Sequence, residues 1–224
     1  MSLNLQKDEI KKTVNAMLDD LSATVSSQTA AENIDLRYKI GDLRAYYETE
    51  IADGDFAASL LDCFTTARED NGRLIAFGQL RENLFAATPK GDISLAIVQM
   101  GIVYCLSAES RIISEMTFVS RNDVDLMIDK MKTAFDTARE LVADAADSSA
   151  YRALIQLSGA LTNHLANVSR PLPRMVTFDM RVVLPALTLS NRVYHDPTRW
   201  EEICDENKIV HPAFCPMSIV GLSS

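Results

Sequence analysis

Apolar residues recur at steps of three and four from the start of the chain to about residue 168, which is the spacing of one face of an α-helix. The first such stretch places Ile10, Val14, Met17 and Leu21 on one side. The 224 residues include only 8 glycines and 7 prolines, and turn-rich β-sandwiches and barrels use more of both. The pattern therefore predicts a mainly α protein, a multi-helix bundle with long helical hairpins.

Short polar or glycine-containing segments divide this pattern into seven expected helices. The expected ranges are 5–25, 34–51, 56–70, 74–85, 93–118, 122–142 and 151–168. Asp92 and either Asn122 or Asp123 stand where helix N-caps are expected, and Thr29 with Glu32 has the spacing of a capping box. The last two helices, separated by a short polar segment, are expected to form a helical hairpin.

The sequence changes character after residue 168. Three prolines fall between residues 171 and 185, and short helices are expected from about 184 and from 196. The run 175–178 could pair as a β-strand with 218–222. We therefore divide the chain into a helical body, residues 1–168 with a candidate sub-boundary near 89–92, and a small, irregular, proline-rich C-terminal docking module, residues 169–224.

The charge of the chain argues against two classes of partner. Its 22 basic and 31 acidic residues give a formal charge of -9 at pH 7, so much of the surface would repel nucleic acid or an anionic membrane. The most apolar stretch, 93–106, contains Gln99 and is shorter than the ~20 residues that a spanning helix needs. We expect no direct nucleic-acid contact and no membrane passage.

Patterns typical of catalysis and metal binding are weak. No serine lies in a Gly-x-Ser-x-Gly context, and no glycine-rich phosphate loop occurs. Cys204, His211 and Cys215 could suggest zinc, but a structural site needs four ligands, and only His195 offers a fourth nearby. The four cysteines form no dense framework and are expected as free thiols. We predict no enzyme, no catalytic residue, no metal site and no cofactor.

Five short motifs follow one another in the last third of the chain. They are Tyr151-Arg-Ala-Leu, Leu172-Pro-Arg-Met-Val-Thr, Leu184-Pro-Ala-Leu, Asn191-Arg-Val-Tyr-His-Asp and Asn207-Lys-Ile-Val-His-Pro-Ala-Phe. Together they make residues 151–222 resemble the C-terminal half of the Mu-like phage tail proteins of the DNA circularisation protein family. Glu206 stands where that family usually has arginine, and Ala213 where it has glycine. Residues 1–90 show only helical periodicity, so nothing is carried over from the family's separate N-terminal domain.

The resemblance implies a structural subunit of a contractile-type bacteriophage tail, in the baseplate or hub region, or of a prophage remnant. Such a virion structural protein is assembled in the bacterial host cytoplasm, resides in the virion tail and acts through protein–protein interfaces. It would contact other tail and baseplate proteins as a homo-oligomer with threefold or sixfold symmetry around the tail axis. The alternative is a helical tail-assembly chaperone or prophage regulatory protein that is not retained in the particle. The net charge gives no support for handling DNA.

The motif-bearing tail supplies the candidate interface residues. They are Arg174, Arg192, Tyr194, Arg199, Trp200, His211, Pro212 and Phe214. The arginines either bind a neighbouring subunit or cap helix ends and loop carbonyls within the chain. Tyr194 and Trp200 are either anchors for a partner or part of a local core. The histidine before Pro212 is expected to fix a turn through a hydrogen bond between its imidazole and the backbone.

Overall fold

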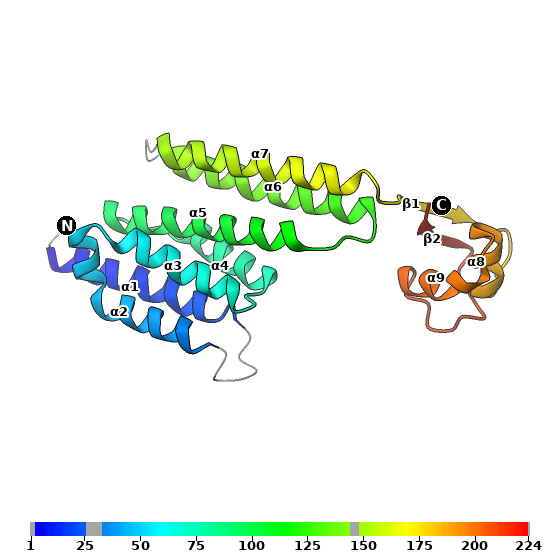
Figure 1. Ribbon diagram of the computed structural model, residues 1–224, viewed down its shortest axis with the longest axis horizontal. Helices are drawn as coiled ribbons and strands as arrows, with labels where there is room; N and C mark the ends of the chain where they lie inside the picture. Colours follow the sequence, from blue (N-terminus) through cyan, green and yellow to red (C-terminus); the bar gives the residue numbers. More distant parts are fainter. Residues whose placement is uncertain (1–2, 26–32, 144–147, 224) are drawn as a thin grey trace. The chain divides into compact units, whose positions relative to one another are not determined.

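The computed structural model confirms a mainly α fold and describes residues 3–25, 33–143 and 148–223 (Figure 1). The helices are α1 (Leu3–Ser22), α2 (Ile34–Asp53), α3 (Phe56–Glu69), α4 (Leu74–Ala86), α5 (Asp92–Glu115), α6 (Arg121–Ala143), α7 (Ser148–Ser169), α8 (Ala186–Tyr194), the short 3-10 helix η1 (Pro197–Arg199) and α9 (Trp200–Glu206). The strands β1 (Met175–Asp179) and β2 (Ser218–Leu222) form a two-stranded sheet.

Contacts between residues divide the chain into two compact units. Unit 1 comprises residues 1–116 and 131–162, and unit 2 comprises residues 117–130 and 163–224. The sequence-based division places the boundary at residue 168, whereas unit 2 also takes in the start of α6 and the end of α7. Two hydrogen bonds account for part of this grouping, because Arg121 N donates to Pro173 O (2.9 Å) and Met175 N donates to Asn122 Oδ1 (3.1 Å).

Unit 1 is built around α5, which packs against α1, α3 and α4. Its residues Ile97 and Ile102 are fully buried together with Phe64 of α3 and Phe77 of α4. A side chain at Gly101 would come within 2.6 Å of the Met17 sulfur of α1, so this glycine allows the two helices to approach closely. The nearly all-apolar surface of α5 is therefore explained by its neighbours on several sides.

Helix α5 lies close to the expected range 93–118. The apolar run ends near residue 106, but the helix continues to Glu115, and by length and composition alone this 24-residue helix could cross a membrane. The core helix of a bundle passes the same test, and 56% of its most apolar window is buried. Our expectation of no membrane passage stays a prediction.

Two of the expected helix caps are wrong by one to three positions. The N-cap of α5 is Gly91, and Asp92 is the first helical residue. At the start of α6, Asp123 N donates to Ser120 Oγ (3.2 Å) while Ser120 N donates to Asp123 Oδ2 (3.1 Å), which is a reciprocal capping box. The cap is therefore Ser120, because its hydroxyl reaches the free N–H that an N-cap must satisfy. The proposed box at 29–32 lies outside the described residues.

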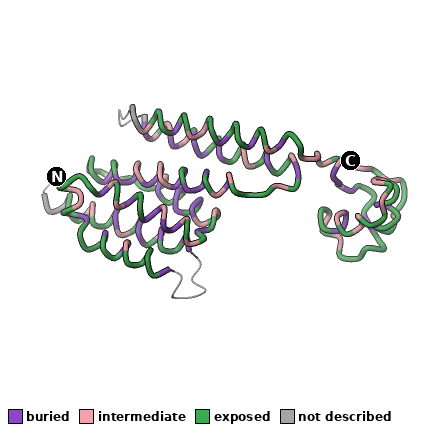
Figure 2. The backbone as a smooth tube through the Cα atoms, in the orientation of Figure 1, coloured by how far each residue is buried: buried purple, intermediate pink, exposed green. Residues whose placement is uncertain are grey.

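Unit 2 confirms the predicted β pair. The strands run antiparallel with Met175 opposite Leu222 and Phe178 opposite Ile219. The core of the unit consists of Ala186, Leu189, Ile203, Cys204, Cys215 and Ile219, from α8, α9, β2 and the loop before it. In Figure 2 most of the tube of this unit is coloured as exposed, and only short stretches are coloured as buried. Unit 2 thus has a small hydrophobic core of its own.

Candidate interaction surface

Arg199 is engaged within unit 2. Its Nε and Nη2 atoms donate to the Glu202 carboxylate at 2.9 and 2.6 Å, and its guanidinium carbon lies 3.7 Å from the centre of the Tyr194 ring. The hydrogen bond to Glu202 raises the pKa of Arg199. A bidentate pair and a cation–π contact leave little of the guanidinium free, so Arg199 holds α8, η1 and α9 together.

Tyr194 and Trp200 belong to the local core rather than to a free surface. Both side chains are half-buried and pack against the unit 2 core. Burial is the main reason that the pKa of Tyr194 is raised. The aromatic ring also lies close to β2, since a side chain at Gly221 would come within 2.3 Å of its hydroxyl. Their role is to join α8 and α9 to the sheet.

The segment around Pro212 forms the predicted turn. Ala213 N donates to His211 Nδ1 (3.3 Å), and Phe214 N donates to His211 O (3.0 Å). The Pro212 carbonyl accepts from Ala186 N at the start of α8 (2.7 Å) and from Cys215 Sγ (3.7 Å). The expected hydrogen bond between the imidazole and the backbone is confirmed, with the imidazole nitrogen as the acceptor. The turn is thereby fixed to α8, while the His211 and Phe214 rings lie on the surface 5.4 Å apart.

The same hydrogen bonds bring together two segments that expose large apolar side chains. Cys215 N donates to Leu184 O (3.2 Å), so the loop 210–217 runs beside residues 184–186. Val210 is 99% exposed, Phe214 72% and Met217 54%. We call the exposed apolar residues of the loop 210–217 and of the segment 182–187 the apolar loop surface: Val182, Val183, Leu187, Val210, Phe214 and Met217. Sequence reasoning found only Phe214, because in an irregular segment no periodicity separates buried from exposed apolar residues.

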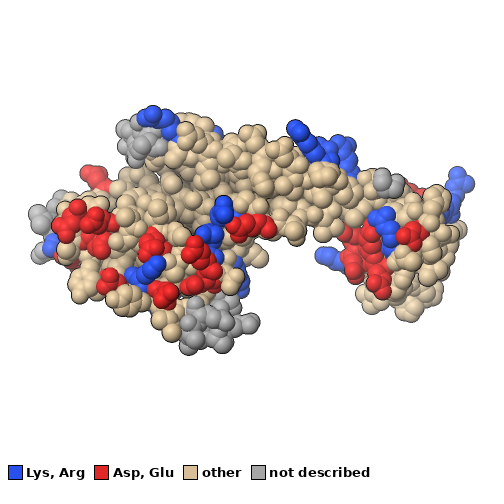
Figure 3. All heavy atoms as spheres, in the orientation of Figure 1, with Lys and Arg blue, Asp and Glu red and all other residues tan. Residues whose placement is uncertain are grey.

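Arg174 and Arg192 both have exposed side chains. The main chain of Arg174 continues the sheet, since its N–H donates to Ser223 Oγ (2.9 Å) and its carbonyl accepts from Ser223 N (2.7 Å). Residues 169–224 carry six basic and six acidic residues, so the whole charge of -9 belongs to residues 1–168. Acidic side chains accordingly gather over α1–α4 on the face shown in Figure 3. The C-terminal module can approach partners of either charge.

The pockets of unit 1 are lined by groups with structural partners. A pocket of about 480 Å³ between α5, α6 and α7 is lined by apolar side chains, by Tyr104 and by Gln99, whose amide donates to Leu141 O (3.0 Å). A second, of about 350 Å³, contains two carboxylates. Glu9 accepts from Lys90 N (2.5 Å), and Asp20 accepts from the Asn83 amide (2.9 Å). These carboxylates therefore tie α1 to neighbouring elements.

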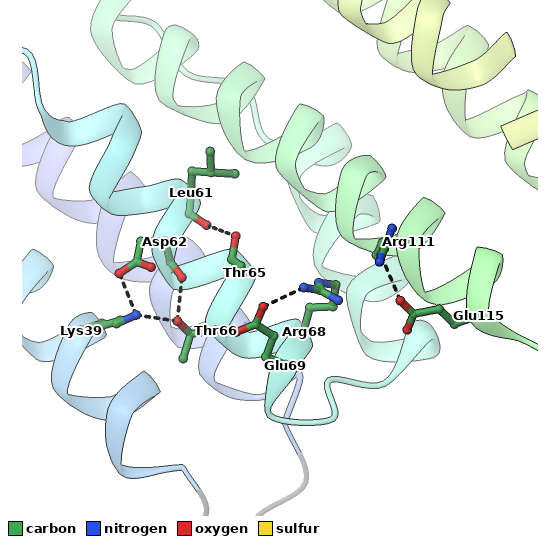
Figure 4. Close-up of polar contacts among 9 residues, drawn as sticks. All are labelled: Lys39, Leu61, Asp62, Thr65, Thr66, Arg68, Glu69, Arg111 and Glu115. Carbon is green, nitrogen blue, oxygen red and sulfur yellow. Dashed lines mark hydrogen bonds and ion pairs between the residues drawn. The ribbon is translucent and has the colours of Figure 1, made fainter. Parts of the chain in front are cut away.

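Charged groups on the surface of unit 1 are likewise paired within the chain (Figure 4). Lys39 of α2 donates to Asp62 (2.8 Å) and to Thr66 Oγ1 (2.9 Å) of α3, and this contact with Asp62 raises the pKa of Lys39. Along α5, Arg111 bonds Glu115 one turn later (2.9 Å). Such exposed pairs contribute little to stability individually, but the contacts of Lys39 connect α2 to α3.

The cysteine thiols are poor nucleophiles in this fold. Burial raises the pKa of Cys63 to about 11 and that of Cys105 well above its ordinary value. Cys204 and Cys215 lie in the unit 2 core, where burial also raises the pKa of each thiol, whereas His211 is exposed on the turn. No group of three or more histidine, cysteine or acidic side chains that could hold a metal occurs in the part of the chain that the structure describes.

No known family model matches this chain, and no curated protein matches it in sequence. The fold and the surface define a mainly α protein that carries a small α/β C-terminal module. Large apolar side chains of that module are exposed on the apolar loop surface.

Proposed function

We propose that this chain is a structural subunit of a contractile-type phage tail, in the baseplate or hub region, which docks onto neighbouring tail proteins through its C-terminal module. The support from sequence is the ordered set of motifs in residues 151–222. The observation that carries the proposal is the apolar loop surface, which lies on a module with its own buried core. Exposed apolar groups that gather in one place are typical of protein–protein contact sites.

The geometry of the turn suits docking. The bonds from Ala186 N to Pro212 O and from Cys215 N to Leu184 O hold the loop against α8. The main chain around Phe214 is therefore held in place, so little main-chain entropy is lost when a partner covers this residue. Aromatic side chains of this kind are frequent anchors at the centre of an interface.

The location of the chain tests the proposal most directly. Particles released from the bacterium that carries the gene are purified and their proteins identified by mass spectrometry. A structural subunit is expected in the particle in several copies. A tail-assembly chaperone or a prophage regulator would be present in the cell extract and absent from the particle, and that outcome would refute a structural role.

The docking surface is tested by two matched substitutions. Phe214→Ser removes an exposed aromatic side chain from unit 2, and Ile75→Ser removes an equally exposed apolar side chain (83%) from α4 in unit 1. With the adjacent tail proteins co-expressed, Phe214→Ser is expected to weaken capture by roughly thirtyfold, the effect of losing an interface anchor. Ile75→Ser should leave capture unchanged. Equal behaviour of the two variants would show that the apolar loop surface is not the docking site.

A further inference from the structure

The two strands of unit 2 differ in how their outer edges are covered. Met180 N donates to Met217 O (2.6 Å) and Ser223 N to Arg174 O (2.7 Å), so the even-numbered residues of β1 direct their main-chain groups toward β2. In an antiparallel ladder the alternate residues direct theirs away from the partner strand. The outward groups of β1 therefore belong to Met175, Thr177 and Asp179.

The outer edge of β2 is closed by a side chain. Asn207, just after α9, donates from Nδ2 to Val220 O and accepts at Oδ1 from Val220 N, both at 2.7 Å. One amide thus satisfies both outward groups at the middle of β2, as a neighbouring strand would. This arrangement protects β2 from pairing with another chain.

The outer edge of β1 is open along most of its length. Asn122 Oδ1 accepts from Met175 N at one end (3.1 Å). Within residues 3–25, 33–143 and 148–223, no hydrogen bond reaches the main chain of Thr177 on this side. The side chains of Thr177 and Asp179 are exposed, and Val176 is 39% exposed. An open edge of this kind is a template for strand addition.

We propose that β1 pairs with β1 of a second copy of this chain, antiparallel about a twofold axis through Thr177. The two sheets then form one four-stranded sheet in the order β2–β1–β1–β2. Thr177 exchanges two hydrogen bonds with Thr177 of the second copy, and each Asp179 N–H donates to the opposite Met175 carbonyl. Asn122 already occupies the Met175 N–H, so the ladder ends there with four hydrogen bonds.

The side chains of β1 complement one another in this register. Val176 lies opposite Phe178 of the second copy, and pairs of β-branched and aromatic residues stabilise antiparallel sheets. Thr177 lies opposite Thr177, which is also a favourable cross-strand pair. Arg174 precedes the strand and Asp179 ends it, so antiparallel pairing brings the basic end of each strand beside the acidic end of the other. Parallel pairing would bring like charges together, and for this reason we assign a second copy in antiparallel orientation.

Oligomeric state tests the proposal. The full chain is expected to be a concentration-dependent dimer by sedimentation equilibrium. Thr177→Pro removes an N–H that points away from β2, so the β1–β2 ladder stays intact while two inter-chain bonds are lost; the dimer should weaken by roughly tenfold to a hundredfold. Thr177→Val keeps the N–H and the β-branched shape and should keep the dimer. Far-UV circular dichroism and Trp200 fluorescence confirm that each variant is folded.

Crosslinking tests the register independently. The Cα atoms of a hydrogen-bonded antiparallel pair lie about 5.5 Å apart, which suits a disulfide. Thr177→Cys should therefore form a crosslinked dimer with oxidised glutathione. Asp179→Cys should not, because this residue lies about 14 Å from its counterpart across the axis.

Three results would overturn the proposal: a wild-type chain that stays monomeric at the highest soluble concentration, a dimer unaffected by Thr177→Pro, or crosslinking of Asp179→Cys as fast as that of Thr177→Cys. The pairing does not rest on the tail function. Absence of the chain from phage particles would leave the dimer intact, and a monomeric chain would leave docking through the apolar loop surface open to its own test.

Discussion

The buried ion pair between α4 and α5 offers the sharpest test of how unit 1 is held together. Arg81 Nε donates to Glu109 Oε2 at 2.9 Å, and the two side chains are only 4% and 1% exposed. Removing one partner of such a pair leaves the other charge buried without compensation, which costs about 3–5 kcal/mol. We therefore expect substitutions at either residue to be among the most destabilising in the chain.

The surroundings make the two substitutions unequal. Arg81 also bonds the largely exposed Glu82 (2.8 Å) and lies 5.2 Å from the centre of the Phe85 ring. After Glu109→Ala the guanidinium keeps these contacts, so the loss should lie near the lower value, about 3 kcal/mol. Arg81→Met removes the ion pair together with the contacts of Arg81 to Glu82 and Phe85, so its loss should lie near the upper value, about 5 kcal/mol.

Urea unfolding followed by far-UV circular dichroism measures this effect. With a slope of about 2 kcal/mol per M, the midpoint should fall by about 1.5 M for Glu109→Ala and by more for Arg81→Met. The double variant Arg81→Met with Glu109→Leu buries no charge and should be more stable than Arg81→Met alone. Fluorescence of Trp200, the single tryptophan of the chain, reports on unit 2 as an internal reference. Losses below about 1 kcal/mol for both single variants, or a double variant no more stable than Arg81→Met alone, would refute the reasoning.

Three further predictions concern local contacts. Gly221→Ala places a methyl group 2.3 Å from the Tyr194 hydroxyl and should destabilise unit 2 by about 1–3 kcal/mol in the Trp200 transition; adding Tyr194→Phe should recover part of this loss, and no recovery would contradict the clash. Asn207→Ala removes both hydrogen bonds to the β2 edge and should cost about 1–3 kcal/mol by the same assay, with Asn207→Asp intermediate because it keeps the acceptor. Burial raises the pKa of Cys63 from 9.0 to about 11 in the folded protein. The neutral thiol therefore contributes to the free energy of unfolding below pH 9, and this contribution is lost as the pH rises toward 11. Cys63→Ala should therefore lose less stability than the wild type between pH 8 and pH 11 in urea unfolding, and equal losses would be inconsistent with that pKa.

Several elements could be read from the chain because their signals are local. The helices follow from apolar residues three and four positions apart, and the β pair follows from two short runs bounded by prolines and turns. The N-cap of α6 shows that local sequence patterns do not always determine where a helix begins. Ser120 and Asp123 have the spacing of a capping box, yet the pattern alone also allowed Asn122 or Asp123 as the N-cap.

The roles of some candidate interface residues could be predicted from local sequence, and the roles of others could not. The turn at His211 and Pro212 was predictable because an X-Pro bond restricts the residue before it. The role of Arg199 was not, since Glu202 and Tyr194 reach it only when α8, η1 and α9 pack together.

The sequence by itself determined the local structure of this protein: a helical body, a short β pair, the turn at Pro212 and a negative charge confined to the body. Tertiary structure alone decided which groups remain available to a partner. It placed Asn207 over the β2 edge and left the main chain of Thr177 open on β1, and it exposed Val210 while burying the nearby Cys215. The physical reason is that periodicity reports the conformation of a segment, whereas burial and hydrogen bonding in irregular segments depend on neighbours that are distant along the chain.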